Sequence, residues 1–288
     1  GDYVSAEPFL LRELKIKEKA QGPDHPTVAD VLTQLGIIHL DKGDYLKAEE
    51  LFLKSLGIYE RAQQAEKNEV AWLSIALGNI HYDRGDYENA EKYFQRSRAV
   101  LEKIFGPDHY HLTDSFSYLG HVAYDVGDYA KAEAMFGRAL SLMEKGLGQD
   151  HPVVTGYRNH LATVYITTGE YEKAEALYRQ SLFLHDQKTI MGQPVVQETL
   201  YGLARLYAAR GQPAEAVKFQ AQAGELEENY IELNLAAGSE REKQAFLASL
   251  SARASRNISL HAELAPNDAP IAEMRATKRG APRLIKGR

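Results

Sequence analysis

The chain has 288 residues and a net charge of −6, with 44% hydrophobic and 26% charged residues. This composition is typical of a folded protein and excludes a mainly disordered one. The acidic balance argues against a nucleic-acid partner. No apolar run approaches the roughly 20 residues of a membrane-spanning helix, so we expect no membrane partner.

A Gly-Asp-Tyr motif recurs along the chain every 42 residues and changes its last residues in the final copies. The repeat glycines are Gly1, Gly43, Gly85, Gly127, Gly169 and Gly211. Five residues after each glycine stands an alanine, such as Ala48, and four residues further on a large side chain, such as Phe52. A constant period of this length indicates an array of units that bury their apolar faces against their neighbours.

Each part of the repeat has an expected mechanical role. The glycine can end the first helix of a pair in a left-handed conformation, and the aspartate after it can cap the second helix. Small residues such as Gly36 and Ala48 let the two helices approach closely, while Leu35 and Phe52 fill the space beside them. The pattern therefore predicts helix–turn–helix units with helices of about 14 and 20 residues.

The motifs Leu-Gly-x-x-Tyr and Ala-x-x-x-Phe, with a loop such as Gly22-Pro23-Asp24-His25-Pro26, resemble the long tetratricopeptide (TPR) repeats of the kinesin-light-chain type. The resemblance covers about residues 1–236. It implies an all-α fold, an α–α superhelix or TPR solenoid, that begins with a lone second helix followed by five helix pairs. For function it implies protein binding. Residues 63–69 have no Gly or Pro, so we expect a more helical connection there.

The C-terminal part follows a different pattern. Ser239-Glu240-Arg241-Glu242 is a capping box that opens a predicted helical connector over residues 239–273. Residues 274–288 are basic, and we expect this tail to be disordered or truncated. Residues 241–268 resemble the connector of bacterial TPR proteins that end in a CHAT domain, a caspase-like protease. This resemblance implies an alternative function, the regulatory sensor arm of a larger effector with a downstream catalytic domain.

Catalytic and metal-binding residues are not predicted. The chain has no cysteine, which excludes thiolate chemistry and fits a reducing, cytoplasmic location. Tyr118, His121 and His160 can meet on adjacent helices, but no motif supports a reaction, so we predict that the chain is not an enzyme and needs no cofactor. Three histidines recur at one loop position, which favours repeat punctuation over a metal site. They are His25, His109 and His151. His39 and His81 replace the TPR tyrosine, and we interpret them as packing residues.

In a TPR superhelix the first helices line the concave face. Here they carry amides, aromatic rings and histidines that the repeat does not require, and such a face suits an extended peptide. A solvated polar face without a ligand is the alternative. The residues predicted to form the peptide-binding groove are Asn79, Asp83, Tyr118, His121, Asp125, Asn159, His160, Tyr201 and Arg205.

Asp41, Asp83 and Asp125 recur in the last turn of the first helices, where a carboxylate opposes the helix dipole by about 0.3–1 kcal/mol. Two interpretations stay open. The carboxylates bind Lys or Arg of a basic partner, or they pair locally with Lys42 and Arg84. The basic tail itself is one candidate ligand for such a groove.

Overall fold

The computed structural model describes residues 3–187 and 194–237, and every regular element in these residues is a helix. The helices are α1 (Tyr3–Gln21), α2 (Pro26–Asp41), α3 (Tyr45–Arg61), α4 (Asn68–Asp83), α5 (Tyr87–Phe105), the 3-10 turn η1 (Tyr110–Leu112), α6 (Thr113–Asp125), α7 (Tyr129–Leu147), α8 (Val154–Thr168), α9 (Tyr171–Gln187), α10 (Pro194–Ala209) and α11 (Pro213–Ala237). None of these helices is long and apolar enough to span a membrane.

The predicted architecture is confirmed for the described residues. A lone second helix, α1, is followed by five helix pairs, and the second helices α1, α3, α5, α7, α9 and α11 each begin 42 residues apart. Among the first helices, α2 and α4 also begin 42 residues apart, whereas α6 begins later in its repeat because η1 precedes it. The connector predicted over residues 239–273, its resemblance to TPR–CHAT proteins and the tail over 274–288 lie outside the described residues.

The turn within each pair is built as the repeat motif predicts. Gly43 has a φ of +77°, and the four later repeat glycines have φ values between +74° and +84°. The Asp44 amide donates to the carbonyl of His39 at 2.9 Å, which ends α2 in a left-handed turn. The Asp44 carboxylate then accepts from the Lys47 amide at 3.2 Å and caps α3.

The connection between α3 and α4 differs from our expectation. We expected more helix in residues 63–69, but α3 ends at Arg61 and α4 begins only at Asn68. Gln63 has a φ of +56°, and the next amide, that of Gln64, donates to the Tyr59 carbonyl at 2.9 Å. A non-glycine residue thus takes the left-handed position that ends a helix, at a modest cost in backbone energy.

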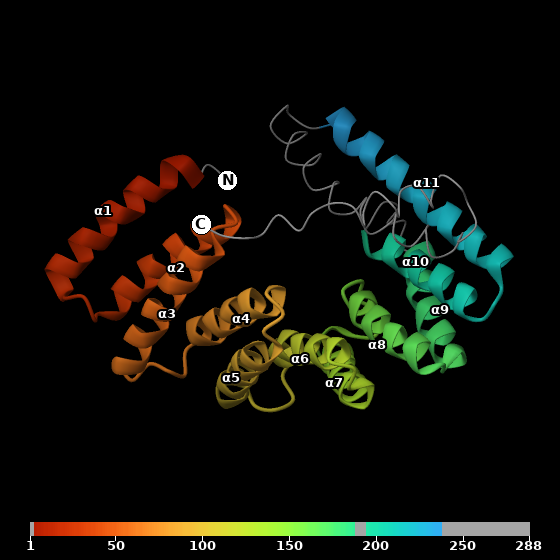
Figure 1. Cartoon of the computed structure of the whole chain (residues 1–288), viewed down its shortest axis with the longest axis horizontal. Helices are drawn as coiled ribbons and strands as arrows, with labels where there is room; N and C mark the ends of the chain where they lie inside the picture. Colours follow the sequence, from red (N-terminus) through yellow and green to blue (C-terminus); the bar gives the residue numbers. More distant parts are fainter. Residues whose placement is uncertain (1–2, 188–193, 238–288) are drawn as a thin grey trace. The chain divides into compact units, whose positions relative to one another are not determined.

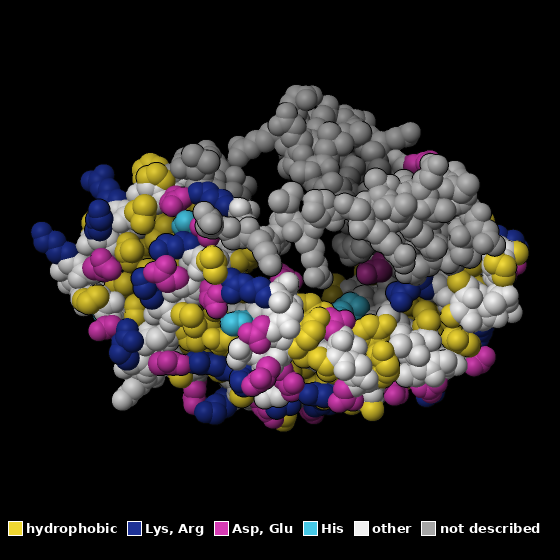
Figure 2. Space-filling view, viewed as in Figure 1, with side chains coloured by type: hydrophobic (Ala, Val, Ile, Leu, Met, Phe, Trp, Pro, Cys, Tyr) yellow, Lys and Arg dark blue, Asp and Glu magenta, His cyan; other side chains and the backbone are white. Residues whose placement is uncertain are grey.

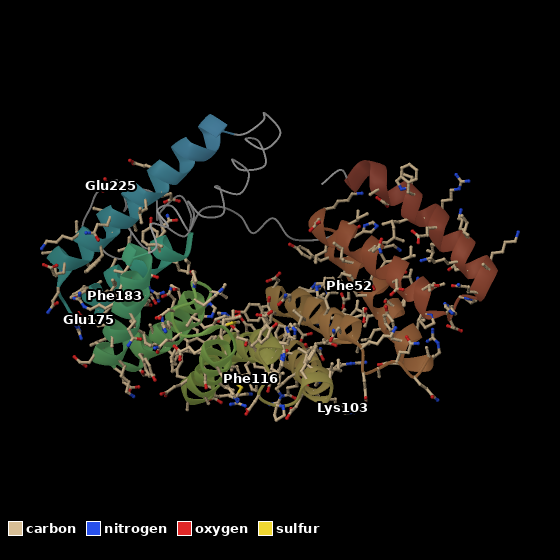
Figure 3. All side chains as sticks on the ribbon, turned by 180° about the vertical axis from the view of Figure 1, so that it is seen from behind. Phe52, Lys103, Phe116, Glu175, Phe183 and Glu225 are labelled. Atoms are coloured by element: carbon tan, nitrogen blue, oxygen red, sulfur yellow. The ribbon has the colours of Figure 1, made fainter. Side chains whose placement is uncertain are left out.

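The described residues fall into two compact units, unit 1 up to residue 157 and unit 2 from residue 158, and we describe each unit by itself. In unit 1, Figure 1 shows α4 and α6 in one layer and α5 and α7 in the other. We call the exposed side of α2, α4 and α6 the first-helix face of unit 1. The core lies between the two layers and includes Phe52, labelled in Figure 3, and Phe94, both of which are fully buried.

Each pair in unit 1 is held by a phenylalanine ring that lies directly against a glycine of the first helix. A Cβ atom built on Gly78 would come within 2.4 Å of the Phe94 ring, and one on Gly36 within 2.4 Å of the Phe52 ring. Gly120 and Phe136 repeat this arrangement at 2.7 Å. The glycine in the Leu-Gly motif is therefore needed for close helix packing, as the motif predicts.

Acidic residues in the loops between repeats bond to basic residues at the ends of the second helices, which the repeat motif does not predict. Arg61 Nε donates to Asp24 Oδ1 at 3.0 Å, from 37 residues further along the chain. The same separation joins Lys103 to Glu66 and Lys145 to Asp108, each at 3.0 Å. The connecting loop before each of these first helices is thereby tied to the end of the following second helix.

A second set of ion pairs joins successive repeats. In the first two repeats the glutamate that follows the repeat alanine, Glu7 on α1 or Glu49 on α3, pairs with side chains at the end of the first helix of the next repeat. His81 Nε2 lies 3.4 Å from Glu49, and Arg84 pairs with the same carboxylate at 2.5 Å. Glu7 holds His39 and Lys42 in the same way. We refer to this arrangement as the glutamate clamp.

Candidate partner-binding face

The residues predicted to bind a peptide lie on first helices in both units. Unit 1 carries five of them on α4 and α6, and unit 2 carries four on α8 and α10. The five in unit 1 are Asn79, Asp83, Tyr118, His121 and Asp125, and the four in unit 2 are Asn159, His160, Tyr201 and Arg205. The predicted residues therefore fall into two sets, one in each unit.

In unit 1 the central side chains rest on buried rings. Tyr118 stacks on Phe94 with ring centroids 4.9 Å apart, and His121 meets the edge of Phe136 at 5.0 Å. Tyr118, His121 and Asn79 are all half-buried. Figure 2 shows acidic and hydrophobic side chains interspersed over α4 and α6. Supported, half-buried polar side chains of this kind lose little freedom when a ligand binds.

The ion pairs of the structure bear on one of the two interpretations above, the local pairing of the carboxylates at the ends of the first helices. Lys42 pairs with Glu7 and Arg84 pairs with Glu49, so local pairing of these bases with Asp41 and Asp83 is not observed. Asp41 and Asp83 are exposed. Asp125 is exposed as well and accepts a hydrogen bond from the Tyr82 hydroxyl.

Burial lowers the pKa of His121 below its ordinary value of 6.5, although the nearby Asp125 opposes the shift. The folded chain therefore releases this proton more readily than the unfolded chain does. The contribution of neutral His121 to stability is present above pH 6.5 and is lost as the pH falls below it.

We expect the His121→Phe variant to lose less stability than the wild type when the pH falls from about 7 to about 5. The change removes the titrating group and keeps an aromatic ring beside Phe136. Urea unfolding at several pH values measures this difference. If the free energy of unfolding changes equally with pH in both proteins, His121 is not the group responsible for this pH dependence.

In unit 2 the structure revises one predicted groove residue. Asn159 is only 3% exposed. Its amide nitrogen donates to Thr199 Oγ1 at 2.9 Å, and its amide oxygen accepts from the same hydroxyl at 3.2 Å. A buried amide must be hydrogen-bonded, and this one joins α8 to α10. We therefore assign Asn159 to helix packing and not to a ligand site.

The other three predicted residues of unit 2 are accessible to different degrees. His160 is half-buried and Arg205 is exposed. The Tyr201 hydroxyl donates to Glu227 at 3.3 Å, and burial raises the pKa of Tyr201 to about 12. Tyr201 therefore stays protonated and acts as a hydrogen-bond donor at neutral pH.

The recurring loop histidines act as helix caps. The Nδ1 atoms of His25, His109 and His151 each accept from the backbone amide two residues further on, at 3.3 Å. Among the residues that the structure describes, no group of three or more His, Asp or Glu side chains could hold a metal ion. His39 and His81 belong to the glutamate clamps, in agreement with a packing role.

The repeat register also places an aromatic side chain, Trp72, on the first-helix face of unit 1, although it is not among the nine residues predicted to form the groove. Trp72 on α4 is 41% exposed. It shares a repeat position with Asp30 on α2 and Asp114 on α6, each 42 residues away. The 42-residue register was the signal that could have placed these three side chains in one row. The exposure of Trp72 required the structure, because a lone tryptophan in a helix is more often buried.

Comparison with known proteins agrees with this architecture. A tetratricopeptide repeat family model matches residues 1–61, 69–145 and 112–187, and a second tetratricopeptide repeat model matches residues 159–227. No curated protein matched the chain.

Among solved structures, BtubC (BKLC) from P. vanneervenii has a TM-score of 0.61 and 22% identity over 66% of this chain and 76% of its own. TPR-like repeats described as those of a kinesin light chain from Podosopora anserina have a TM-score of 0.60 and 20% identity, covering 70% of this chain and 96% of theirs. A tetratricopeptide repeat protein from Parabacteroides merdae has a TM-score of 0.58 and 20% identity over 95% and 91%.

Identities this low establish the fold alone. Arrays of such repeats generally act as non-enzymatic scaffolds for contacts between proteins. The family models together match well over half of the residues. The chain therefore belongs to the tetratricopeptide repeat family.

Proposed function

We propose that this chain is an interaction scaffold that binds an extended segment of a partner protein on the first-helix face of unit 1. The observation that carries the proposal is the set of half-buried polar side chains on this face. Asn79, Tyr118 and His121 supply amide, hydroxyl and imidazole groups on adjacent first helices. An extended peptide presents backbone donors and acceptors that such groups can pair.

The partner segment is expected to be basic. Asp41 and Asp83 are exposed carboxylates, while the neighbouring Lys42 and Arg84 are engaged in glutamate clamps. A basic ligand would complement the charge of these aspartates. Since exposed charges are screened beyond about 10 Å at 0.1 M salt, we expect binding to weaken as salt is added.

The test is replacement of Tyr118 and His121 by alanine. We expect the affinity for the partner segment to fall by more than about tenfold, or about 1.4 kcal/mol, because both side chains contribute contacts on the proposed face. Calorimetric titration measures the affinity. Because Tyr118 stacks on Phe94, thermal unfolding must show that the variant is still folded.

Lys92→Ala on α5 is the control for this test, since Lys92 is 62% exposed and lies on a second helix. A larger loss of affinity in the control than in the Tyr118 and His121 variant would assign binding to the second-helix side and reject the proposed face.

The alternative function, a sensor arm of a larger effector, is supported by the resemblance of residues 241–268 to the connector of TPR–CHAT proteins. The gene sequence beyond Arg288 tests it. A downstream His and Cys in an α/β pattern would favour the sensor arm, and binding of a partner on the first-helix face is compatible with it.

A further inference from the structure

Trp72 is the chain's single tryptophan and lies on the first-helix face of unit 1. Its ring meets the edge of Phe52 with centroids 5.6 Å apart, and 41% of the residue is exposed. The Phe52 contact supports one side of the indole and leaves much of the rest open. Tryptophan is among the side chains that contribute most to binding energy at protein interfaces. The position therefore suits a ligand group that can lie on an aromatic ring.

Two carboxylates occupy the same repeat position on the helices beside Trp72. Asp30 on α2 and Asp114 on α6 are both exposed. Asp30 accepts a hydrogen bond from the Tyr59 hydroxyl, and Asp114 accepts one from the Tyr157 hydroxyl at 2.9 Å. Each tyrosine bonds only the Oδ1 atom of its carboxylate. The bonds orient both carboxylates and leave the second oxygen of each as an acceptor.

The charged side chains of the three first helices of unit 1, apart from histidine, are all acidic. Helices α2, α4 and α6 contain no Lys or Arg. Their acidic residues are Asp30, Asp41, Glu69, Asp83, Asp114 and Asp125. Two basic side chains from outside these helices approach rings beside the row: Lys67 Nζ lies 5.6 Å from the centroid of the Tyr59 ring, and the Arg98 guanidinium lies 5.7 Å from that of Phe116. The three helices themselves carry six acidic and no basic side chains, so the charge of this face complements a basic segment.

An arginine fits this row better than a lysine does. A guanidinium group is planar, stacks on an aromatic ring and pairs with a carboxylate through two N–H groups. It is also more weakly hydrated than an ammonium group, so it loses less when it leaves water. A stacked cation gains about 0.5–2 kcal/mol from the ring, and tryptophan gives the strongest interaction.

We propose that Asp30, Trp72 and Asp114 bind arginine side chains of a basic, extended segment of a partner protein. One guanidinium lies on the indole of Trp72, and further arginines of the segment pair with the carboxylates on α2 and α6. This inference rests on the proposed function, because it names the chemistry of the partner segment that the first-helix face would bind.

The experiment uses the full chain and two synthetic peptides of equal length and charge. In one peptide arginine alternates with serine, and in the other lysine replaces every arginine. The fluorescence of Trp72 reports binding directly, since no other tryptophan is present. We expect the arginine peptide to change this fluorescence and to bind about tenfold more tightly than the lysine peptide, as measured by calorimetry.

Variants separate the arginine site from general charge attraction. Trp72→Leu should remove the preference for the arginine peptide over the lysine peptide. The double variant Asp30→Asn and Asp114→Asn should lower the affinity for the arginine peptide by about tenfold. The matched control is Glu88→Gln on α5, which removes a charge from an 81% exposed side chain on a second helix and should change neither result. Circular dichroism and thermal unfolding confirm that each variant is folded.

Equal affinity for the two peptides, or an unchanged preference in Trp72→Leu, would overturn the arginine site. If the arginine site fails in this way but the Tyr118 and His121 substitutions still weaken binding, the proposed function remains supported. If the arginine peptide binds only after the four arginines of residues 274–288 are replaced by serine, the row belongs to the chain's own tail. That result would overturn the assignment to a partner protein.

Discussion

Replacing Gly78 by alanine is expected to lower the free energy of unfolding by about 1–2 kcal/mol, although alanine is the better helix former. The new Cβ atom would lie 2.4 Å from Cε1 and 2.7 Å from Cδ1 of the Phe94 ring. The ring is fully buried and stacks on Tyr118, so it cannot withdraw without disturbing α6. Overpacking therefore outweighs the gain in helix propensity.

Gly137→Ala is the matched control for this substitution. Gly137 also lies inside a helix, α7, but a Cβ atom there would meet nothing within 4 Å. Here alanine should raise stability by about 0.5–1 kcal/mol, because only the helix propensity changes. Urea unfolding compares the two variants. Adding Phe94→Leu to Gly78→Ala should recover part of the loss, and full additivity of the two changes would contradict the proposed clash.

Replacing Glu175 by glutamine is expected to destabilise unit 2 by about 1–3 kcal/mol, because charged hydrogen bonds to a largely buried carboxylate would be lost. Glu175, labelled in Figure 3, belongs to the glutamate clamp between α9 and α10. Its carboxylate accepts from Tyr207 at 2.7 Å and from Arg179 at 2.8 Å, and it pairs with Arg210. The Glu175 side chain is 20% exposed.

The pKa of Glu175 predicts how this contribution depends on pH. Burial alone would raise the pKa, but hydrogen bonds from Tyr207, Arg179 and Arg210 outweigh it and lower the pKa to about 2. The stabilisation is complete above the ordinary value of 4.5 and is lost as the pH falls from there toward about 2. The wild type and Glu175→Gln should therefore differ at pH 7 and converge in acid.

Glu172→Gln provides the control, because Glu172 contacts the same arginine at 3.1 Å but its side chain is 87% exposed. We expect it to change stability by less than about 0.5 kcal/mol. Hydrogen exchange in α9 and α10 locates the effect within unit 2. Equal destabilisation by the two substitutions would show that burial of the clamp carboxylate is unimportant.

Much of the fold could be predicted from the sequence because its signals are local. A left-handed glycine and the capping aspartate after it act within one turn, so Gly43 and Asp44 could be interpreted without knowledge of distant residues. The constant register of 42 residues then placed every described helix pair. The same register gathered Asn79, Tyr118 and His121 on first helices of one unit.

Features that depend on contacts between helices were decided by the tertiary structure. The pairing of Asp24 with Arg61 spans 37 residues, and its geometry depends on how successive helices pack. Packing also buried Asn159 against Thr199, so a side chain that looks polar in the sequence serves as a helix contact. The tertiary structure likewise leaves Trp72 41% exposed, with one edge against Phe52. Local sequence determines where helices begin and end, whereas burial depends on neighbours that are distant in the chain.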